Sequence, residues 1–217
     1  GVLVALGVLA AFWVITRLGT KAGRDTEQLL NLAIYCAISG LLGAKLLYIL
    51  LEYRRYLSNP GELFTLATLQ SGGAFYGGLI LALLVSVLYM HRQKMPWRET
   101  ADIFAPAIAI GHGMGRLGCF AAGCCWGDRC ERAWAVTFTN PEANRLVGVP
   151  LNIPLHPTQL YEAFGEFAIF GFLYWRYQRT HAPGHIIGLY LVLYSVLRFA
   201  VEVVRNHEPA NMLGLPL

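Results

Sequence analysis

The chain has 217 residues, of which 56% are hydrophobic and only 14% carry a charged side chain. Soluble globular domains contain about 25% charged residues, so this composition excludes an ordinary soluble domain and favours a protein that crosses a membrane several times. The formal net charge of +4 comes from basic residues scattered between apolar segments, which excludes a nucleic-acid-binding surface.

Six hydrophobic segments follow one another, and we predict a membrane helix for each. They cover residues 2–15, 29–53, 74–89, 101–120, 158–177 and 185–204. The first lacks a basic head and a small-residue cleavage site, which predicts a span rather than a signal peptide. Because it begins at Gly1 without an initiator Met, we expect the chain to be truncated or processed there. The predicted fold is all-α, one transmembrane helix bundle over residues 1–217.

The loops between the segments predict the orientation of the chain. Short loops after the first, third and fifth segments hold eight Lys and Arg residues, and the opposite side holds six. The positive-inside rule places the first set in the cytoplasm and the amino terminus outside. On this topology, residues 126–155 form a loop insert at the outer face.

Glycines cluster in and around the third and fourth segments. Residues 72–73 and 77–78 are glycine pairs that flank Tyr76, which predicts either a close approach to a ligand or close helix packing. Four more glycines predict a broken helix at the end of the fourth segment, where irregular backbone would be buried or line a cavity. They are Gly111, Gly113, Gly115 and Gly118.

Three cations lie inside hydrophobic segments, each nearer the outer end: Lys45, Arg116 and Arg198. Ionisable groups at that depth are costly, so each is a functional-site candidate, and snorkelling to the interface is the alternative. The planar guanidinium of Arg116 offers five donors in a fixed fork, which suits a phosphate or a carboxylate.

Polar residues in the last segment follow an i, i+4, i+8, i+11 spacing, which predicts a single helix face. They are Tyr194, Arg198, Glu202 and Arg205. Pairing of Arg198 with Glu202 is the purely structural alternative. Two arginines from different segments that face one outer-leaflet cavity would form a receptor for an anionic lipid headgroup.

Two histidines lie close to these arginines in the predicted arrangement. His156 precedes Pro157, which predicts that the fifth helix begins just after His156, with Gln159 and Glu162 on one face behind it. His156 is either a catalytic group or an interfacial hydrogen bonder. His112, which lies among the glycines of the fourth segment, is predicted to be a satisfied buried imidazole.

Four of the five cysteines fall within residues 119–130. Their spacing does not match the paired Cys-x2-Cys pattern of zinc sites, so no metal is predicted. On an oxidising outer face, Cys125 and Cys130 are expected to form a disulfide, with Cys119–Cys124 as another possible pair. Cys119 is three residues from Arg116, whose charge would favour a thiolate, so we expect Cys119 to be the free, most reactive thiol.

Several of these strings, in order along nearly the whole chain, resemble the prolipoprotein diacylglyceryl transferase family. They are residues 71–78, Asp102-x3-Pro106, residues 115–127, residues 156–162 and Tyr194-x3-Arg198-x3-Glu202-x2-Arg205. The resemblance implies transfer of the diacylglyceryl group of phosphatidylglycerol to the lipobox cysteine thiol of a prelipoprotein. Glycerol phosphate would leave, and no metal or organic cofactor would be needed. It also implies a bacterial inner-membrane protein whose site faces the periplasm.

The resemblance assigns roles to individual residues. Arg116 and Arg198 match arginines that are thought to bind the phospholipid headgroup, and Gly127 and Tyr194 match other functionally important positions. The expected catalytic residues are Arg116, Arg198, Tyr76, Tyr194 and His156. The expected substrate-binding residues are Arg116, Arg198, Cys119, Gly127, Gln159, Glu202 and Arg205.

The chain also departs from the family pattern. Tyr76 replaces a His that is often proposed as the base, Cys119 replaces Asn, and Lys45 replaces Arg; a final family helix is expected after residue 217. A tyrosine with a pKa of roughly 10 is a poor base near neutral pH. Either His112 or His156 takes the thiol proton, or arginines mainly stabilise the departing phosphate.

Two alternative functions follow from these departures and from the polar groups inside a polytopic chain. The first is a divergent paralogue that transfers a lipid-derived group to another acceptor, or that uses its own Cys119 or Cys125. The second is a lipid or small-molecule transporter.

Overall fold

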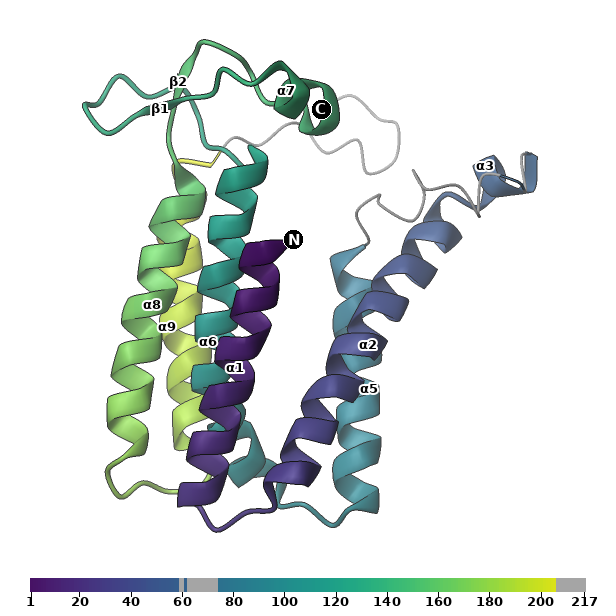
Figure 1. The fold of residues 1–217 in the computed structure, drawn as a ribbon, viewed down its shortest axis with the longest axis vertical. Coiled ribbons are helices and arrows are strands. Elements are labelled where there is room, and N and C mark those ends of the chain that lie inside the picture. Colours follow the sequence, from purple (N-terminus) through teal and green to yellow (C-terminus); the bar gives the residue numbers. More distant parts are fainter. Residues whose placement is uncertain (59–60, 62–73, 206–217) are drawn as a thin grey trace. The chain divides into compact units, whose positions relative to one another are not determined.

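A computed structural model describes residues 1–58, 61 and 74–205 of the chain. Its helices are α1 (Val2–Lys21), α2 (Thr26–Leu51), α3 (Tyr53–Ser58), α5 (Phe75–Arg92), α6 (Trp97–Ala122), α7 (Pro141–Val147), α8 (Thr158–Tyr177) and α9 (His185–Glu202). Two short strands, β1 (Val136–Thr137) and β2 (Pro154–Leu155), pair antiparallel (Figure 1). The predicted all-α class is confirmed, and each predicted segment coincides with a long helix.

Five of the helices in the described residues are long and apolar enough to cross a membrane. They are α1, α2, α5, α6 and α9. The remaining long helix, α8, spans 20 residues and buries two carboxylates, Glu162 and Glu166. The chain is therefore a multi-pass membrane protein, and α8 carries two of the buried carboxylates among the described residues.

The chain divides into two compact units, which are described separately. The first comprises residues 1–14 and 101–217, and the second comprises residues 15–100. In the second unit, α2 and α5 pack through glycines: a Cβ on Gly78 would lie 2.7 Å from the carbonyl oxygen of Gly40, and one on Gly43 would strike the carbonyl of Gly77. Close helix packing therefore accounts for residues 77–78, whereas residues 72–73 lie outside the described part.

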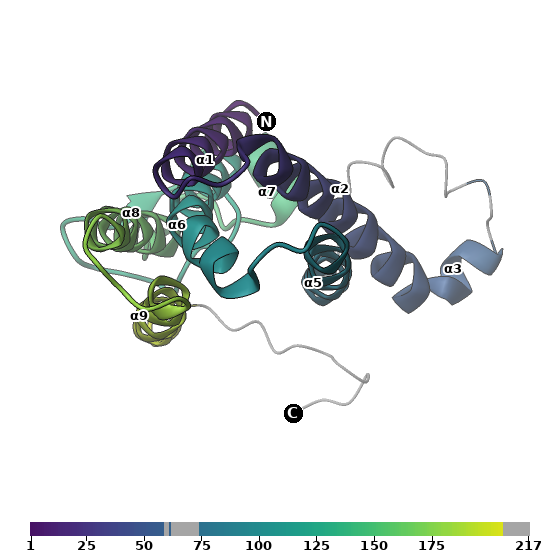
Figure 2. The ribbon, with the colours of Figure 1, turned by 90° about the horizontal axis from the view of Figure 1, so that it is seen from below.

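In the first unit, α6, α8, α9 and the first turns of α1 stand side by side (Figures 1 and 2). Glycines again mark the helix contacts: a Cβ on Gly7 would lie 2.9 Å from Met114 Cβ, and one on Gly113 would lie 2.7 Å from the ring of Phe167. The helix α6 runs unbroken from Trp97 to Ala122, so the predicted break near its end is wrong. Packing against neighbouring helices outweighs the low helix propensity of glycine.

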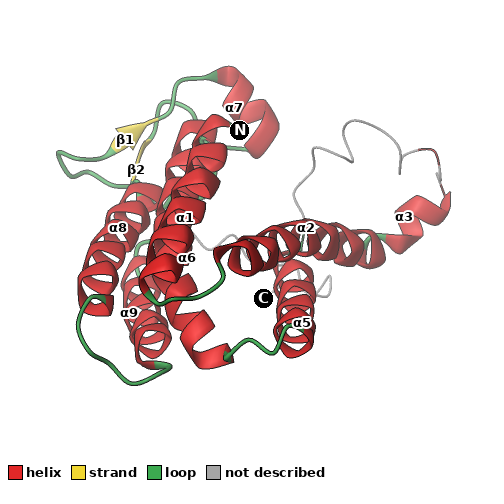
Figure 3. Cartoon of the chain, turned by 60° about the horizontal axis from the view of Figure 1, so that its bottom comes forward, coloured by secondary structure: helices red, strands yellow, loops and turns green. Residues whose placement is uncertain are grey.

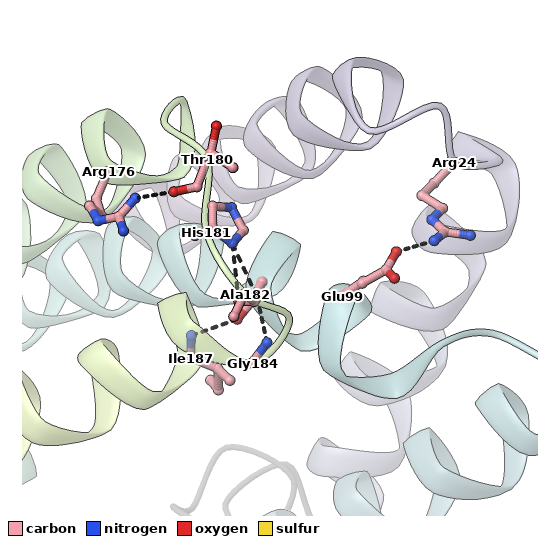
Figure 4. A network of polar contacts seen from close by, with 9 residues as sticks. Arg24, Glu99, Arg176, Thr180, His181, Ala182, Gly184 and Ile187 are labelled. Atoms are coloured by element: carbon pink, nitrogen blue, oxygen red, sulfur yellow. Dashed lines mark hydrogen bonds and ion pairs between the residues drawn. The ribbon is translucent and has the colours of Figure 1, made fainter.

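A buried carboxylate ties the start of α6 to the start of α9. Asp102 is 1% exposed, and it accepts hydrogen bonds from the backbone N–H groups of Gly184 (2.7 Å) and Ile187 (2.9 Å) (Figure 4). These amides belong to the first turn of α9, which otherwise lacks partners for them, and the negative charge suits a helix N-terminus. The contact helps to set the position of α9 beside α6.

Residues 126–155, here called the cap, connect α6 to α8. They contain β1, α7 and β2 and lie over one end of the α6 and α8 helices (Figure 3). Asn140 caps α7 by accepting the backbone N–H of Glu142 at 2.9 Å, and Gly148 ends that helix with a φ of 74°. The predicted loop insert is therefore a folded layer placed directly beside the end of α6.

Candidate active site

The turn that ends α6 brings cysteines together. The N–H of Cys124 donates to the carbonyl of Cys119 and the N–H of Gly123 to that of Phe120, both at 3.1 Å, and Gly123 has a φ of 74°. This pair of bonds around a left-handed glycine is a Schellman cap. It reverses the chain, so the two residues after Gly123 fold back beside the last turn of α6.

Three thiols meet at this turn. The sulfur atoms of Cys119, Cys124 and Cys125 all lie within 4.8 Å of one another, and all three side chains are half-buried. The structure contains all five cysteines as free thiols, so the expected Cys125–Cys130 disulfide is not formed. Cys125 is turned toward the other two sulfurs, whereas Cys130 is buried in the cap, with its N–H bonded to Pro154 in β2.

The first turn of α8 holds the backbone of these cysteines. Thr158 donates its hydroxyl to the carbonyl of Cys125 at 2.7 Å, and Gln159 donates its amide to the carbonyl of Cys124 at 2.6 Å. Both side chains are buried, with exposures of 2% and 1%. Gln159, which was expected to bind substrate, thus contacts the turn of residues 119–125, here called the thiol turn.

The environment of the cluster separates the acidities of its thiols. Hydrogen bonds from Cys119 and Cys124, followed by the charges of Arg116 and Arg205, lower the pKa of the Cys125 thiol. Hydrogen bonding to the Cys119 and Cys125 sulfurs raises the pKa of Cys124. The structure therefore favours Cys125, not the expected Cys119, as the cysteine most readily present as a thiolate.

A charged network lies next to the thiols, between α6 and α8. Arg116 Nη2 is 2.8 Å from Glu162 Oε1. His112 lies between two carboxylates, with Nδ1 2.7 Å from Glu166 Oε1 and Nε2 3.6 Å from Glu162 Oε1. The side chains of Glu162 and Glu166 are only 2% and 0% exposed. Buried charges require such partners. His112 is paired, as predicted, but its side chain is 27% exposed, so it is half-buried and not the buried imidazole that was expected.

Sequence analysis did not identify Glu166 as a site residue. It follows Glu162 by four positions, so both carboxylates fall on one face of α8, and this spacing was the available signal. Its Oε2 atom is buried and has no hydrogen-bond partner among the described residues. Glu166 therefore places a carboxylate oxygen without a described partner deep in the helix packing, beside His112.

The helix α9 contributes an arginine and a tyrosine to the same region. Arg198 Nη2 is 2.5 Å from Glu202 Oε2, so the i, i+4 pair that was the purely structural alternative is present. The ring of Tyr194 lies 5.3 Å from that of His112, edge to face, and within electrostatic influence of Arg116 and Arg198. Tyr194 thus lies where the polar faces of α6 and α9 meet.

Each arginine keeps a buried nitrogen without a hydrogen-bond partner within the described residues: Nε of Arg116 and Nη1 of Arg198. Buried donors in native proteins are almost always paired, and leaving one unpaired is costly. The same side chains are 17% and 30% exposed, so part of each guanidinium is still accessible. The two arginines are suited to an anion that would satisfy these donors.

Arg205 does not share the helix face predicted for it. The helix α9 ends at Glu202, and Arg205 instead pairs its backbone with Gly127 in an isolated β-bridge. The neighbouring Asp128 N–H donates to the carbonyl of Val204 at 3.0 Å. Backbone bonding to the start of the cap replaces further helix and leaves Arg205 beside the thiol turn.

Gly127 lies where three chain segments cross. Its N–H donates to the carbonyl of His156 at 2.9 Å. A Cβ there would lie 2.7 Å from Thr158 Cγ2 and 2.8 Å from His156 Cβ, and would also strike the carbonyl of Val204. Only glycine allows this approach, so Gly127 secures the junction of the cap, α8 and the chain after α9.

His156 belongs to a polar group at the base of the cap. Its Nδ1 lies 3.1 Å from the hydroxyl of Tyr161, which also accepts a hydrogen bond from Trp134 Nε1 at 2.8 Å. Of the two interpretations of His156, a catalytic group or an interfacial hydrogen bonder, these contacts agree with the hydrogen bonder. Trp134 was not singled out from the sequence, since only the folded cap brings it to Tyr161.

Two expected residues belong to the second unit and are described there. Tyr76 lies in the first turn of α5 and is 68% exposed, with its ring 5.7 Å from that of Phe75. Lys45 lies on α2, half-buried, with Nζ 5.7 Å from the centre of the Tyr48 ring.

A family model and two relatives all carry the description of a prolipoprotein diacylglyceryl transferase. The family model described as prolipoprotein diacylglyceryl transferase matches residues 1–216. The phosphatidylglycerol–prolipoprotein diacylglyceryl transferase of Clostridium tetani is 34% identical over 212 residues, which cover 98% of this chain and 82% of the relative. A protein of the same name from Bordetella bronchiseptica is 36% identical over 194 residues, or 88% of this chain and 68% of the relative.

Proposed function

The chain belongs to the prolipoprotein diacylglyceryl transferase family, and from this premise we propose that it moves the diacylglyceryl group of phosphatidylglycerol to the lipobox cysteine of a prelipoprotein. The names of its relatives specify phosphatidylglycerol and a prolipoprotein as their substrates. The lipobox cysteine as acceptor is part of the proposal. The observation that carries it is the pair of arginines with unpaired buried donors.

Each arginine is anchored at one side and open at another. Glu162 holds Nη2 of Arg116, and Glu202 holds Nη2 of Arg198, while Nε of Arg116 and Nη1 of Arg198 lack hydrogen-bond partners in the described part of the chain. A phosphate has several acceptor oxygens and forms strong charge-assisted bonds to guanidinium groups. The phosphate of phosphatidylglycerol fits this donor set.

The same arginines suit the chemistry of the transfer. The acceptor sulfur forms a bond to a glyceryl carbon as the bond from that carbon to the phosphate oxygen breaks. Negative charge then grows on the phosphate, where fixed cations stabilise it most effectively. The thiol proton goes to a base, and His112, held between Glu162 and Glu166, is our candidate for it.

Location and orientation complete the proposal. We place the protein in the bacterial inner membrane, with the cap and the ends of α6 and α8 toward the periplasm. The distribution of Lys and Arg among the loops supports this orientation. It would put Arg116 at the depth of the outer-leaflet headgroups, where the lipid substrate and a translocated signal peptide can both reach it.

The direct test uses the full-length protein in phosphatidylglycerol vesicles with a fluorescent lipobox peptide. Mass spectrometry should show the peptide gaining one diacylglyceryl group, and vesicles of phosphatidylcholine alone should give no product. Arg145→Lys is the matched control, because Arg145 lies on α7, is 71% exposed and pairs only locally with Glu142. A folded protein that leaves the peptide unmodified under these conditions would show that the proposed activity is wrong.

One observation keeps a second candidate function, a paralogue with a different acceptor. The thiols of Cys124 and Cys125 lie beside that of Cys119, at a position where the resemblance predicts asparagine. Rescue of a bacterial strain that lacks its own transferase would argue against this alternative and for the ordinary acceptor. The transporter hypothesis is not favoured, because the family match covers residues 1–216.

A further inference from the structure

The cluster of Cys119, Cys124 and Cys125 has no role in headgroup binding as described above. We propose that these three sulfur atoms bind one thiophilic d10 cation, of the Zn²⁺ or Cu⁺ class. The donor set is sulfur alone, which selects soft ions over Mg²⁺ or Ca²⁺. Spacing along the chain concealed the site, because the ligands are gathered by a turn and not by a Cys-x2-Cys motif.

The distances fit a single ion. A zinc–sulfur bond of about 2.3 Å places two sulfur ligands of one tetrahedral ion about 3.8 Å apart. In the structure, the three sulfurs all lie within 4.8 Å of one another. Small rotations of the side chains would therefore close the site, without movement of the backbone.

The backbone of the turn is built to hold this geometry. The Schellman cap at Gly123 directs Cys124 back toward Cys119, and Cys125 has a φ of 63°. Left-handed backbone is uncommon for residues other than glycine and costs free energy. That conformation brings the third sulfur to the other two.

A supporting layer fixes the carbonyls of two ligands. Thr158 holds the carbonyl of Cys125 and Gln159 holds that of Cys124, both through buried side chains. Groups of this kind orient the ligands of metal sites and tune their affinity. Here they lie on α8, a rigid element, so the ligands are held from outside their own turn.

Charge balance also favours the site. Three thiolates and a divalent ion leave one excess negative charge, and each thiol releases its proton to solvent as the metal–sulfur bond forms. Arg116 lies within electrostatic influence of Cys119 and Cys125, and Arg205 of Cys125. These cations offset the excess charge, which a site walled only by apolar groups would not do.

Three protein ligands leave a fourth position on a tetrahedral ion for water or for an incoming thiol. A thiol bound to such an ion loses its proton outright. In the proposed transferase, the ion would hold the acceptor cysteine as a thiolate beside Arg116, and the proton of that thiol would pass to His112. That last step rests on the proposed function, but binding of the ion does not.

The experiment measures binding itself. Full-length protein, purified in detergent, is reduced, stripped of metal and titrated with Co²⁺ as a spectroscopic substitute for Zn²⁺, and with Cu⁺ against a chromophoric chelator. We expect one equivalent per chain, with sulfur-to-cobalt charge-transfer absorption that Zn²⁺ abolishes. Cys119→Ser, Cys124→Ser and Cys125→Ser should each lose this signal, whereas Cys36→Ser, which removes a half-buried thiol on α2, should keep it.

A second variant separates a metal site from a loss of folding. Gln159→Leu leaves all the sulfurs in place and should weaken binding about 10–100-fold, with a monodisperse elution profile like that of the unmodified chain. The proposal is overturned if the unmodified chain binds no metal, or if the three cluster variants bind as tightly as Cys36→Ser. Peptide lipidation is measured in a separate assay. A protein that fails to lipidate the peptide therefore still tests whether the three cysteines bind a metal ion.

Discussion

Arg116 and Arg198 have the same design: a carboxylate holds one guanidinium nitrogen, and another nitrogen remains buried without a hydrogen-bond partner among the residues described. The carboxylate orients the planar guanidinium group. An anion that bound the unpaired nitrogen would remove the cost of a buried donor without a partner. The two side chains come from different helices, α6 and α9, so a phosphate that bound both would also connect those helices.

Lysine at either position should therefore be a poor substitute. Arg116→Lys and Arg198→Lys keep the charge but lose the bidentate geometry, and we expect each to lower kcat about 100-fold. Arg205→Lys should be milder, because Arg205 is held mainly through its backbone pairing with Gly127. Lipidation of the peptide in phosphatidylglycerol vesicles measures all of these, with Arg145→Lys as control. Near-normal rates in the first two variants would place the headgroup site elsewhere.

Gly127 illustrates a position where packing alone decides the residue. Gly127→Ala should destabilise the folded protein by about 1–3 kcal/mol, because the added methyl group meets two neighbouring segments and a carbonyl oxygen. Gly171→Ala is the matched control: Gly171 lies on α8, and a Cβ there would meet nothing within 4 Å, so alanine should be neutral or stabilising. Thermal unfolding in detergent compares the two. Equal midpoints would contradict the close approach at Gly127.

The thiol cluster should show an unusual pH dependence in metal-free, reduced protein. Because the pKa of Cys125 is lowered, its thiolate persists as the pH falls below the ordinary thiol value of about 8.5. Cys125 should therefore react with iodoacetamide at pH values where Cys124, whose pKa is raised, does not. Peptide mapping after timed alkylation gives the order, and faster labelling of Cys124 would refute it.

Among the helices, α8 has an unusual role for a segment that is predicted to cross the membrane. Its first turn holds the thiol turn through Thr158 and Gln159, and its next turns bury Glu162 and Glu166 against α6. The charged face points inward, where His112 and Arg116 compensate it. Among the long helices, α8 is thus the one that assembles the site.

Asp102, near the start of α6, holds the first turn of α9, at the opposite end of that helix from Arg198. Asp102→Asn keeps the shape of the side chain but removes the charge that accepts two backbone N–H groups at a buried position. We expect a loss of about 1.5–3 kcal/mol in unfolding free energy. Asp25→Asn is the matched control, since Asp25 caps the exposed start of α2 and asparagine caps equally well. Similar losses in both variants would show that burial of Asp102 is unimportant.

For the chain as a whole, orientation in the membrane is the property that links the site to its substrates. The cap and the turn between α8 and α9 lie at opposite ends of α8, which spans 20 residues, or about 30 Å. In a variant whose native cysteines are replaced by serine, a cysteine introduced at Glu142 in the cap should be labelled by a membrane-impermeant maleimide in cells from which the outer membrane is removed. A cysteine at Thr180 should be labelled only after permeabilisation. The reverse pattern would invert the proposed topology.

Local patterns in the sequence predicted the helices, the membrane class and the arginines. Apolar runs longer than a bilayer core require helices, since no other open structure satisfies the backbone in lipid. Arg116 and Arg198 stood out because charge in such runs is costly. Helical spacing also allowed the Arg198–Glu202 pair as a structural alternative, because residues four apart are neighbours on any helix.

Contacts between distant segments decided the rest. The end of α9 at Glu202 depends on bonding of the following chain to the cap, and the unbroken α6 depends on helices that pack against its glycines. The meeting of Cys119, Cys124 and Cys125 depends on a reversed turn that α8 holds from 33 and 35 residues away. The sequence by itself determined which groups are present and on which helices, since periodicity is local. Only the tertiary structure decided which of these groups meet, because their contacts join residues far apart in the chain.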